Sequence, residues 1–425
     1  MSSHTLTWDQ DDSLLWQATA ALLRPLHLAL AFPSVIYVLV LTVFLFRPPD
    51  LYSCYVDRIA FGVLVFVVTL RVLALRERIP FIAGISLPMF GLAALAISRA
   101  LREPFDPQLW SIIASKFLVP FVLFHIAILV FRGEAQQRHF ETFVILSLAY
   151  LAFIAIAFLT GAYSLIFPGF ILDESLGFHA DRARGPFLQA VANGVSLNLL
   201  GILALVLSPK RKWVVWVLWF TLPLAVLATM TRSVWISFAL STLVLAFRFV
   251  QHRLQVFCIL LVTASLIAGL AAGFSDHSLK NALWDRTAER GPVNARMAVY
   301  DAGWEMFQER PLTGWTAGGM YAELARRMEG YHLRIFYVHN TYLALLVEFG
   351  VPGLALYGIL FFNLFRLSRR GLTGETSSVA ALRRVWPVLL CVYLFNAFFV
   401  DMAYQFVIGL LFTVAGMLCA REEAA

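Results

Sequence analysis

The chain has 425 residues, of which 60% are hydrophobic and only 14% are charged. Roughly a quarter of the residues of soluble globular proteins are charged, so this composition excludes that class. Apolar runs of about 20 residues, the length that crosses a bilayer, recur along the whole chain. We therefore predict an all-α polytopic membrane protein. The net charge of +7 does not point to a nucleic-acid partner, because basic loops are what orient membrane helices.

The predicted elements begin after a polar, then amphipathic N-terminal stretch, residues 1–24. No small-residue cleavage site follows the first apolar run, so we interpret that run as a retained span and not as a signal peptide. Hydrophobic patterning predicts about twelve spans. They cover residues 27–46, 58–76, 80–98, 109–131, 140–160, 187–208, 213–230, 233–250, 254–274, 340–367, 385–402 and 403–420.

Basic residues predict the orientation of these spans, because short cytoplasmic loops are enriched in Lys and Arg. The clusters near Arg132, Lys210, Arg248, Arg369 and Arg421 all fall on the same side when both termini are cytoplasmic. The two long connections, 161–186 and 275–338, then lie on the opposite face. We expect a multi-pass membrane protein with spans 1–9 in residues 1–274, a loop domain on the non-cytoplasmic face in 275–338 and spans 10–12 in 339–425.

The larger connection on the non-cytoplasmic face is polar, with eight basic and eight acidic residues between 275 and 338. Apolar residues recur within it at helical spacing, which predicts two amphipathic helices whose apolar faces lie on the membrane or on the span bundle. Asn294 is the expected N-cap of the first helix, and the Pro311–Gly314 stretch is expected to end it. The apolar positions are Met297, Tyr300, Trp304 and Phe307 in the first helix, and Met320, Leu324 and Met328 in the second.

Four scattered cysteines show no CxxC or metal-ligand spacing, and no phosphate-binding glycine loop is present. We expect no cofactor. Glu174, Asp181 and Asp401 are candidate metal ligands, but none forms an Asp-x-Asp pair, so we predict that arginines replace a metal at any phosphate site. Lys116 and Arg71 lie inside apolar runs, where we expect them to pair or to extend toward the interface.

A histidine marks the point where the large loop re-enters the membrane. His339 and Asn340 sit at the predicted start of a span, where free backbone N–H groups and the positive end of the helix dipole gather. An imidazole held there tends to stay neutral and can accept a proton. The alternative is an interfacial histidine beside an Asn cap. Glu348, nine residues later, lies about 180° around a continuous helix and is expected to face elsewhere.

Several arginines fall on the same predicted face as His339. Arginine suits a diphosphate because its planar guanidinium offers paired donors and stays charged. The alternative for each arginine alone is a lipid headgroup contact or a surface ion pair. The candidate diphosphate-binding residues are Arg184, Arg232, Arg286, Arg296 and Arg334. The candidate supporting residues are Asp181, Asn193, Asn340 and Tyr342.

These motifs also resemble a known family. His339-Asn340-x-Tyr342-Leu followed by Glu348-x-Gly350-x-x-Gly353 resembles the C-terminal signature of the O-antigen ligase and polymerase superfamily. The stretch from Arg184 to Asn193 resembles its Arg-x-x-Gly and Asn element, and Thr231-Arg232-Ser233 resembles its Ser-Arg turn in altered order. The segment from Arg296 to Trp315 is similar to the part that precedes the histidine. The likeness covers about residues 180–365.

The resemblance implies a GT-C-like helical enzyme of a Gram-negative inner membrane that moves a glycan from undecaprenyl diphosphate to an acceptor at the periplasmic face. Residues 275–338 would then be a periplasmic loop domain. An O-antigen ligase, with a lipid A–core acceptor, is favoured because polymerases often carry two sizeable outer loops, whereas this chain has one large outer connection and one modest one. An O-antigen polymerase and a protein O-oligosaccharyltransferase stay open as alternatives. A transporter or lipid flippase is a more distant one, because we find no repeated halves. His339 would be the general base, and the arginines would bind the diphosphate without a metal.

Overall fold

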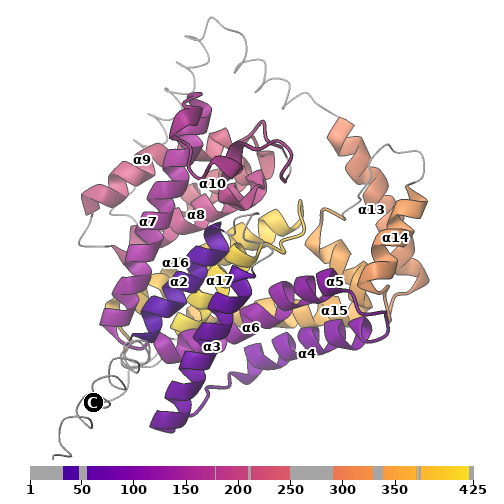
Figure 1. Cartoon of the computed structure of the whole chain (residues 1–425), viewed down its shortest axis with the longest axis horizontal. Coiled ribbons are helices and arrows are strands. Elements are labelled where there is room, and N and C mark those ends of the chain that lie inside the picture. The colour runs from indigo at the N-terminus through magenta and orange to yellow at the C-terminus, as the bar shows by residue number, and fades with distance from the viewer. Residues whose placement is uncertain are drawn as a thin grey trace, which may run out of the picture.

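The structure is a computed structural model that describes residues 32–46, 55–177, 179–208, 212–248, 291–328, 338–369, 371 and 375–420. Helices and turns make up this part of the chain, and no strand occurs in it, which confirms the predicted all-α membrane fold. Figure 1 shows the helices gathered in one bundle, with α13 and α14 at one end of it.

The N-terminal half of the bundle consists of α2 (Pro33–Phe46), α3 (Val56–Leu75), α4 (Ala83–Ala100), α5 (Pro107–Ile113), the π-helical turn η2 (Ala114–Leu118), α6 (Val119–Val130) and α7 (Glu134–Leu159). A connection with the 3-10 turns η3 (Tyr163–Leu165), η4 (Gly169–Leu172) and η5 (Gly185–Phe187) follows. Then come α8 (Ala190–Leu207), α9 (Lys212–Ala228), α10 (Arg232–Arg248), α13 (Gly291–Glu309), α14 (Ala317–Arg327), α15 (Thr341–Arg366), η8 (Leu367–Arg369), α16 (Ser377–Ala397) and α17 (Gln405–Cys419).

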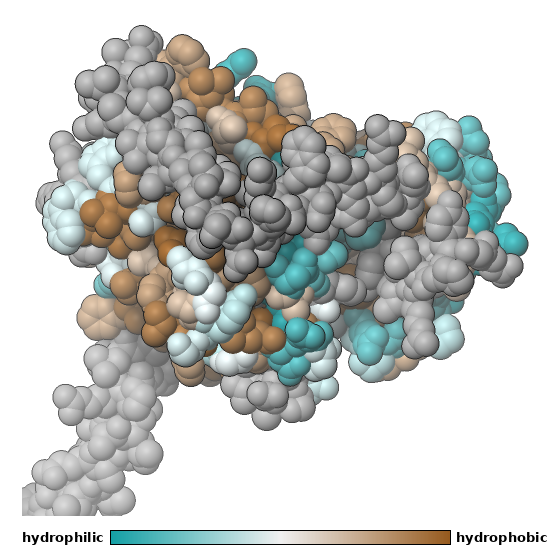
Figure 2. Space-filling view, turned by 90° about the horizontal axis from the view of Figure 1, so that it is seen from above, coloured by the Kyte–Doolittle hydropathy of each residue, from teal (hydrophilic) through white to brown (hydrophobic). Residues whose placement is uncertain are grey.

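Eleven of the twelve predicted spans coincide with apolar helices. Seven described helical stretches are long and apolar enough to cross a membrane, and α2, α9, α10 and α17 are shorter apolar helices. The remaining predicted span, 254–274, lies outside the described residues. Seen from above, hydrophilic side chains gather at the end where α13 and α14 lie, and hydrophobic ones cover much of the other end (Figure 2).

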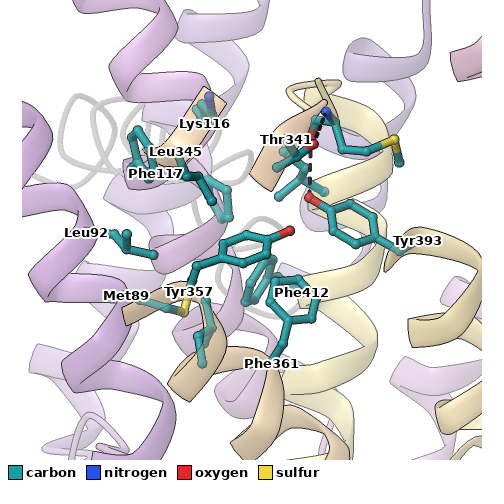
Figure 3. A pocket seen from close by; sticks show the side chains of 14 residues that line it. Met89, Leu92, Lys116, Phe117, Thr341, Leu345, Tyr357, Phe361, Tyr393 and Phe412 are labelled. Atoms are coloured by element: carbon teal, nitrogen blue, oxygen red, sulfur yellow. Dashed lines mark hydrogen bonds between the residues drawn. The ribbon is translucent and has the colours of Figure 1, made fainter. Parts of the chain in front are cut away.

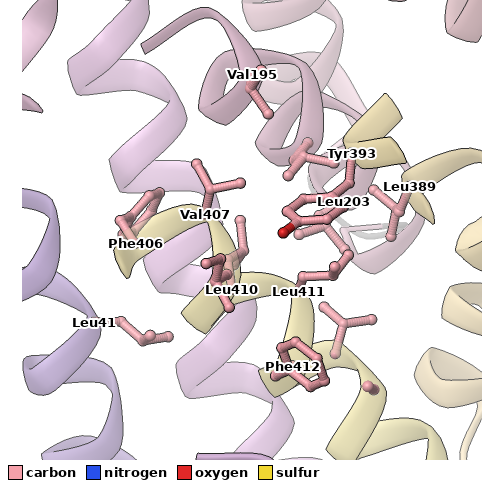
Figure 4. Packing of buried hydrophobic residues seen from close by; sticks show 14 of the residues in the cluster. Leu41, Val195, Leu203, Leu389, Tyr393, Phe406, Val407, Leu410, Leu411 and Phe412 are labelled. Carbon is pink, nitrogen blue, oxygen red and sulfur yellow. The ribbon is translucent and has the colours of Figure 1, made fainter. Parts of the chain in front are cut away.

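The last helix, α17, lies at the centre of the bundle. Every residue from Phe406 to Leu418 is buried, and the helix packs against α2, α6, α8 and α16. Figure 4 shows its Phe406, Leu410 and Leu411 surrounded by side chains of these neighbours. Such all-round burial explains why the segment reads as continuously apolar, without the one-sided pattern of a surface helix.

The prediction of two almost contiguous C-terminal spans, 385–402 and 403–420, needs correction. Helix α16 begins at Ser377 and ends at Ala397, and residues 398–404 form a non-helical link before α17. Thr341, the first residue of α15, holds this link. Its hydroxyl donates to the Val400 carbonyl at 2.9 Å and accepts from the Met402 N–H at 3.0 Å. The link therefore lies beside the start of α15.

Helices α13 and α14 pack onto the first turns of α15. The small core between them includes Met306 from α13, Leu324 from α14, and Ala344 and Val347 from α15. This packing agrees with the expectation that amphipathic helices rest on the span bundle. The buried face of α13 is rotated from the predicted one, however, since Met297 and Trp304 are each about half exposed.

Helix α15 is broken at Gly350, whose backbone (φ 67°, ψ −165°) is not helical. Pro352 lacks the N–H that would otherwise bond to the Glu348 carbonyl one turn earlier. Arg99 of α4 fills that place, because its guanidinium donates to the carbonyls of Glu348 and Phe349. An unpaired carbonyl in a membrane interior costs several kcal/mol, so the arginine stabilises the break.

The loop after α13 seals the other side of the break. The backbone N–H of Trp315 donates to the Val347 carbonyl at 2.7 Å, and the backbone N–H of Val351 donates to the Pro311 carbonyl at 2.8 Å. A β-carbon on Gly314 would lie 2.6 Å from the Glu348 carbonyl oxygen, and one on Gly350 would lie 2.5 Å from the Pro311 carbonyl oxygen. The two glycines therefore allow the loop and the broken helix to meet backbone to backbone.

We predict that Gly350→Ala destabilises the protein. Alanine at φ 67° is strained by about 1–3 kcal/mol, and its β-carbon would also push the Pro311 loop away. Thermal unfolding of purified protein in detergent should show a clearly lower midpoint. Gly358→Ala is the matched control, since nothing lies within 4 Å of a β-carbon at this position in the same helix. An equal midpoint for both variants would contradict the role of Gly350.

Candidate functional site

His339 immediately precedes α15, in a left-handed backbone conformation (φ 48°). Asn340 is the N-cap, as predicted, and its side-chain oxygen accepts from the N–H groups of Tyr342 at 2.9 Å and Leu343 at 3.1 Å. Capping satisfies donors at the helix start and fixes the direction in which the chain enters. The imidazole is thereby held at the membrane-entry point of α15.

Three separate segments fix the backbone around His339. The Tyr300 hydroxyl of α13 donates to the His339 carbonyl at 3.1 Å. The Tyr342 hydroxyl donates to the Leu394 carbonyl of α16 at 2.8 Å. Together with the two bonds of Thr341 to the 398–404 link, these contacts place His339 where α13, α15 and the α16–α17 link meet.

The surroundings of His339 favour its neutral form. The side chain is largely buried, and this burial lowers the pKa of the imidazole below its ordinary value. The positive charge of Arg296 lowers this pKa further, and His179 acts in the same direction. The carboxylate of Asp401 opposes them and raises the pKa. Since the lowering effects dominate, the imidazole is a proton acceptor at neutral pH.

Arg184 occupies a different place from the one expected of a diphosphate ligand. The residue is 1% exposed, and its guanidinium donates to the carbonyls of Ile171, Asp173 and Leu176. The bond to Ile171 measures 2.9 Å. A guanidinium surrounded by loop carbonyls has few donors left for a ligand. This geometry favours a role in shaping the 161–189 connection.

Asn193 serves the same connection from α8, because its amide donates to the Ala183 carbonyl at 2.8 Å. The Ala183 N–H in turn donates to the Ala228 carbonyl at the end of α9, at 3.0 Å. The connection therefore lies beside the tight turn that precedes α10, and Arg232 is the first residue of α10. Arg232 is exposed.

The other predicted site residues fall into three groups. Arg296 of α13 is exposed, and its positive charge lowers the pKa of His339. Asp181 lies 4.0 Å from the His179 ring and 3.6 Å from the Arg182 guanidinium, in the outer connection. Arg286 and Arg334 lie outside the described residues.

Lys116, Glu348 and Asp401 form a charge cluster inside the bundle, of which the sequence predicted only that Lys116 would be paired or would extend toward the interface. Lys116 of η2 lies 3.6 Å from a Glu348 carboxylate oxygen and 3.3 Å from one of Asp401. The pairing of Lys116, like that of Arg71 with Glu77, confirms the expectation for charges in apolar runs. Glu348 points to Lys116, and this partner was not predicted. The signal was present in the sequence as three charges near apolar segments, but their sequence positions do not reveal the pairing.

Among the described residues, no three His, Cys, Asp or Glu side chains gather in the way a metal site requires. Of the three candidate acids, Asp401 is paired with Lys116, and Glu174 and Asp181 belong to the outer connection.

The fold and this site define a polytopic helical membrane protein with a histidine at the start of α15 whose neutral form is favoured by burial and by the exposed Arg296. Residues 216–358 match the family model described as O-antigen ligase. The match includes Arg232, Arg296, His339 and the break at Gly350, and it confirms the resemblance to the O-antigen ligase superfamily. Arg184 and Asn193 precede the matched segment, and Asp401 follows it. No curated protein matches the chain.

We predict that Arg184→Ala loosens the outer connection more than it affects ligand contact. The substitution leaves three carbonyls without donors, at about 1–3 kcal/mol for each buried group left unpaired. Arg184→Lys should rescue only in part, because an ammonium cannot reproduce the planar set of donors. Hydrogen exchange in residues 163–189 and the thermal midpoint measure the effect.

Arg138→Ala is the control for this experiment, because Arg138 is an exposed arginine that forms a surface ion pair with Glu134 one turn away. Normal exchange and stability in Arg184→Ala, combined with weaker donor binding, would restore Arg184 as a diphosphate ligand.

Proposed function

We propose that the protein is an inner-membrane glycosyltransferase of the O-antigen ligase type. It would take a glycan linked to undecaprenyl diphosphate and join it to a sugar of a lipid A–core acceptor at the periplasmic face. The observation that carries this proposal is the neutral, largely buried His339 beside Arg296, within the segment that matches the O-antigen ligase family. The two carboxylates of this region, Glu348 and Asp401, are both paired with Lys116, so we assign neither the role of a glycosyl-accepting nucleophile and take a single inverting displacement as the simplest mechanism.

In this mechanism the His339 imidazole accepts the proton of the acceptor hydroxyl as its oxygen attacks the anomeric carbon. The bond between that carbon and the diphosphate oxygen breaks, and the lipid diphosphate leaves with the electron pair. Arg296 and Arg232, which are both exposed, offset the negative charge that grows on the leaving group. Because Arg184 is bound to loop carbonyls, we assign it a supporting role. Arg286 and Arg334 stay proposed ligands from the sequence alone.

His339→Ala should reduce the transfer rate by about 10²–10⁴-fold, the range for loss of a general base. The pH dependence gives a second readout. A base works when it is unprotonated, so the rate should rise with pH through the pKa of His339 and then level off. The lowered pKa places this rise below the ordinary histidine value of about 6.5. Arg296→Gln removes one cause of the lowering and should shift the rise to higher pH.

Purified protein in nanodiscs, with donor and acceptor supplied, gives the rates. His139→Ala is the control. His139 lies near the start of α7, where its ring is hydrogen-bonded to Ser34 at the start of α2, and it has no role in the proposed site. A near-normal rate in His339→Ala would end the general-base proposal and leave an interfacial histidine.

The ligase reaction is tested against its alternatives in a deletion strain. We expect lipid A–core to lose all attached polymer while polymer remains on undecaprenyl diphosphate. Loss of polymer from both carriers would indicate a polymerase, and unchanged lipid A–core would indicate a protein acceptor or a transporter. Transfer by purified protein should also survive exhaustive chelation of divalent ions. Activity that stops in chelator and returns with magnesium would redirect attention to Asp181 and Glu174.

A further inference from the structure

Three charged side chains from three distant parts of the chain meet inside the bundle. Lys116 comes from η2, Glu348 from the second turn of α15, and Asp401 from the 398–404 link. The side chains of Lys116 and Glu348 are each 10% exposed, and that of Asp401 is 23% exposed. Charges at such depth are costly unless they are paired, so the three groups hold one another in place.

The helix that carries Lys116 has an irregular turn at this position. Residues 114–118 are π-helical between two α-helical stretches. A π-helical turn inserts one extra residue into an α-helix and is found frequently at functional sites. Phe117, the next residue, packs edge-on against Phe349 of α15, with ring centroids 5.7 Å apart. The turn therefore engages α15 through both charge and an aromatic contact.

The cluster is connected to the start of α15, where His339 lies, through two segments. Glu348 belongs to the same unbroken part of α15 that begins at Thr341, and Asp401 stands between Val400 and Met402, the two residues bound to the Thr341 hydroxyl. Figure 3 shows Lys116 on one side of a cavity and Thr341 and Tyr393 on the other, with the bonds to Met402 as dashed lines. Movement of Lys116 would thus displace both segments that position His339.

We propose that Lys116 is a positioning residue of the site, whose ion pairs with Glu348 and Asp401 fix His339 relative to the α16–α17 link. This inference rests on the proposed function for its catalytic consequence, but its structural part does not. Lys116 pairs with Glu348 in α15, the helix that begins at Thr341, and with Asp401 in the link to which Thr341 is hydrogen-bonded. We assign Lys116 no part in the proton transfer itself.

The charges of the cluster also reach His339. The groups that act on the imidazole are Arg296 of α13, His179 of the outer connection and Asp401 of the link. Lys116 partly offsets the negative charge of Asp401. Removal of the lysine charge should therefore raise the pKa of His339, and removal of the Asp401 charge should lower it. The two substitutions shift the acid side of the rate profile in opposite directions, which a purely structural effect would not do.

The experiment compares Lys116→Met, Lys116→Arg and Asp401→Asn in full-length protein in nanodiscs. We expect Lys116→Met to lower kcat by about 10²-fold, as small misplacements of catalytic groups do, with the donor KM unchanged. Its rate profile should move to higher pH and that of Asp401→Asn to lower pH. Lys116→Arg, which keeps the charge, should stay close to the unsubstituted protein. Hydrogen exchange should rise in residues 338–349 and 398–404 of Lys116→Met.

The control removes an ion pair just beyond the end of α6, the helix that continues from η2. Arg132 lies 3.1 Å from Glu77, and Glu77→Gln should leave exchange at 338–349 and the pH profile unchanged. Normal kcat and exchange in Lys116→Met, or an equal effect of Glu77→Gln, would overturn the proposal. If Lys116→Met does not fold, the double variant Lys116→Gln/Glu348→Gln, which removes opposite charges together, is held to the same outcomes.

Exchange needs no substrate, so it separates the two levels of inference. Raised exchange in Lys116→Met together with no glycan transfer by the unsubstituted protein would sink the proposed function and keep the positioning role.

Discussion

A helix that breaks inside a membrane must find partners for its backbone, because lipid offers none. In α15 this constraint is met from outside the helix. Arg99 donates to the carbonyls of Glu348 and Phe349, and the Trp315 N–H binds the Val347 carbonyl. The break thus ties together α4, the loop after α13 and α15. The broken part of α15 leaves carbonyl groups without helical partners, and the side chain from α4 and the backbone of the loop supply the missing donors.

The position of His339 follows from the same arrangement. The loop that seals the break is continuous with α13 and α14, so docking of that loop brings Tyr300 to the His339 carbonyl and Arg296 to the imidazole. On the other side, Thr341 binds the link between α16 and α17. The histidine is therefore placed by backbone hydrogen bonds from rigid elements, while the charge of the exposed Arg296 acts on its ring. Such preorganisation is what proton transfer at a fixed point requires.

Much of this fold can be predicted from the sequence, and the reasons for the failures are physical. Eleven predicted spans coincide with helices because a long apolar run has one way to satisfy its backbone in lipid. The cap at Asn340 was predictable for a similar local reason. The non-helical link at 398–404 was not, because Phe398, Phe399 and Val400 continue the apolar run of α16 and the Thr341 hydroxyl that binds the link comes from a distant part of the chain.

Side-chain roles were harder to predict where partners are distant or belong to the backbone. Arg184 carries a motif-like context, yet its donors bind loop carbonyls, which no sequence pattern announces. Lys116 could be expected to pair, but its partners lie 232 and 285 residues further along the chain. The grouping of Arg296 with His339 stays a prediction, which the effect of the Arg296 charge on the pKa of His339 supports.

The shortness of the central helix α17 has a consequence for the backbone next to it. Its 15 residues span about 22 Å, less than the roughly 30 Å of a bilayer core. Because α17 is enclosed by protein, surrounding lipid has no reason to thin around it. A helix this short leaves part of the bilayer thickness to neighbouring backbone, and the non-helical 398–404 link, which Thr341 binds, continues directly from its start. Irregular backbone of this kind is tolerated at membrane depth only where protein encloses it, so the short α17 and the polar contacts of the link belong together.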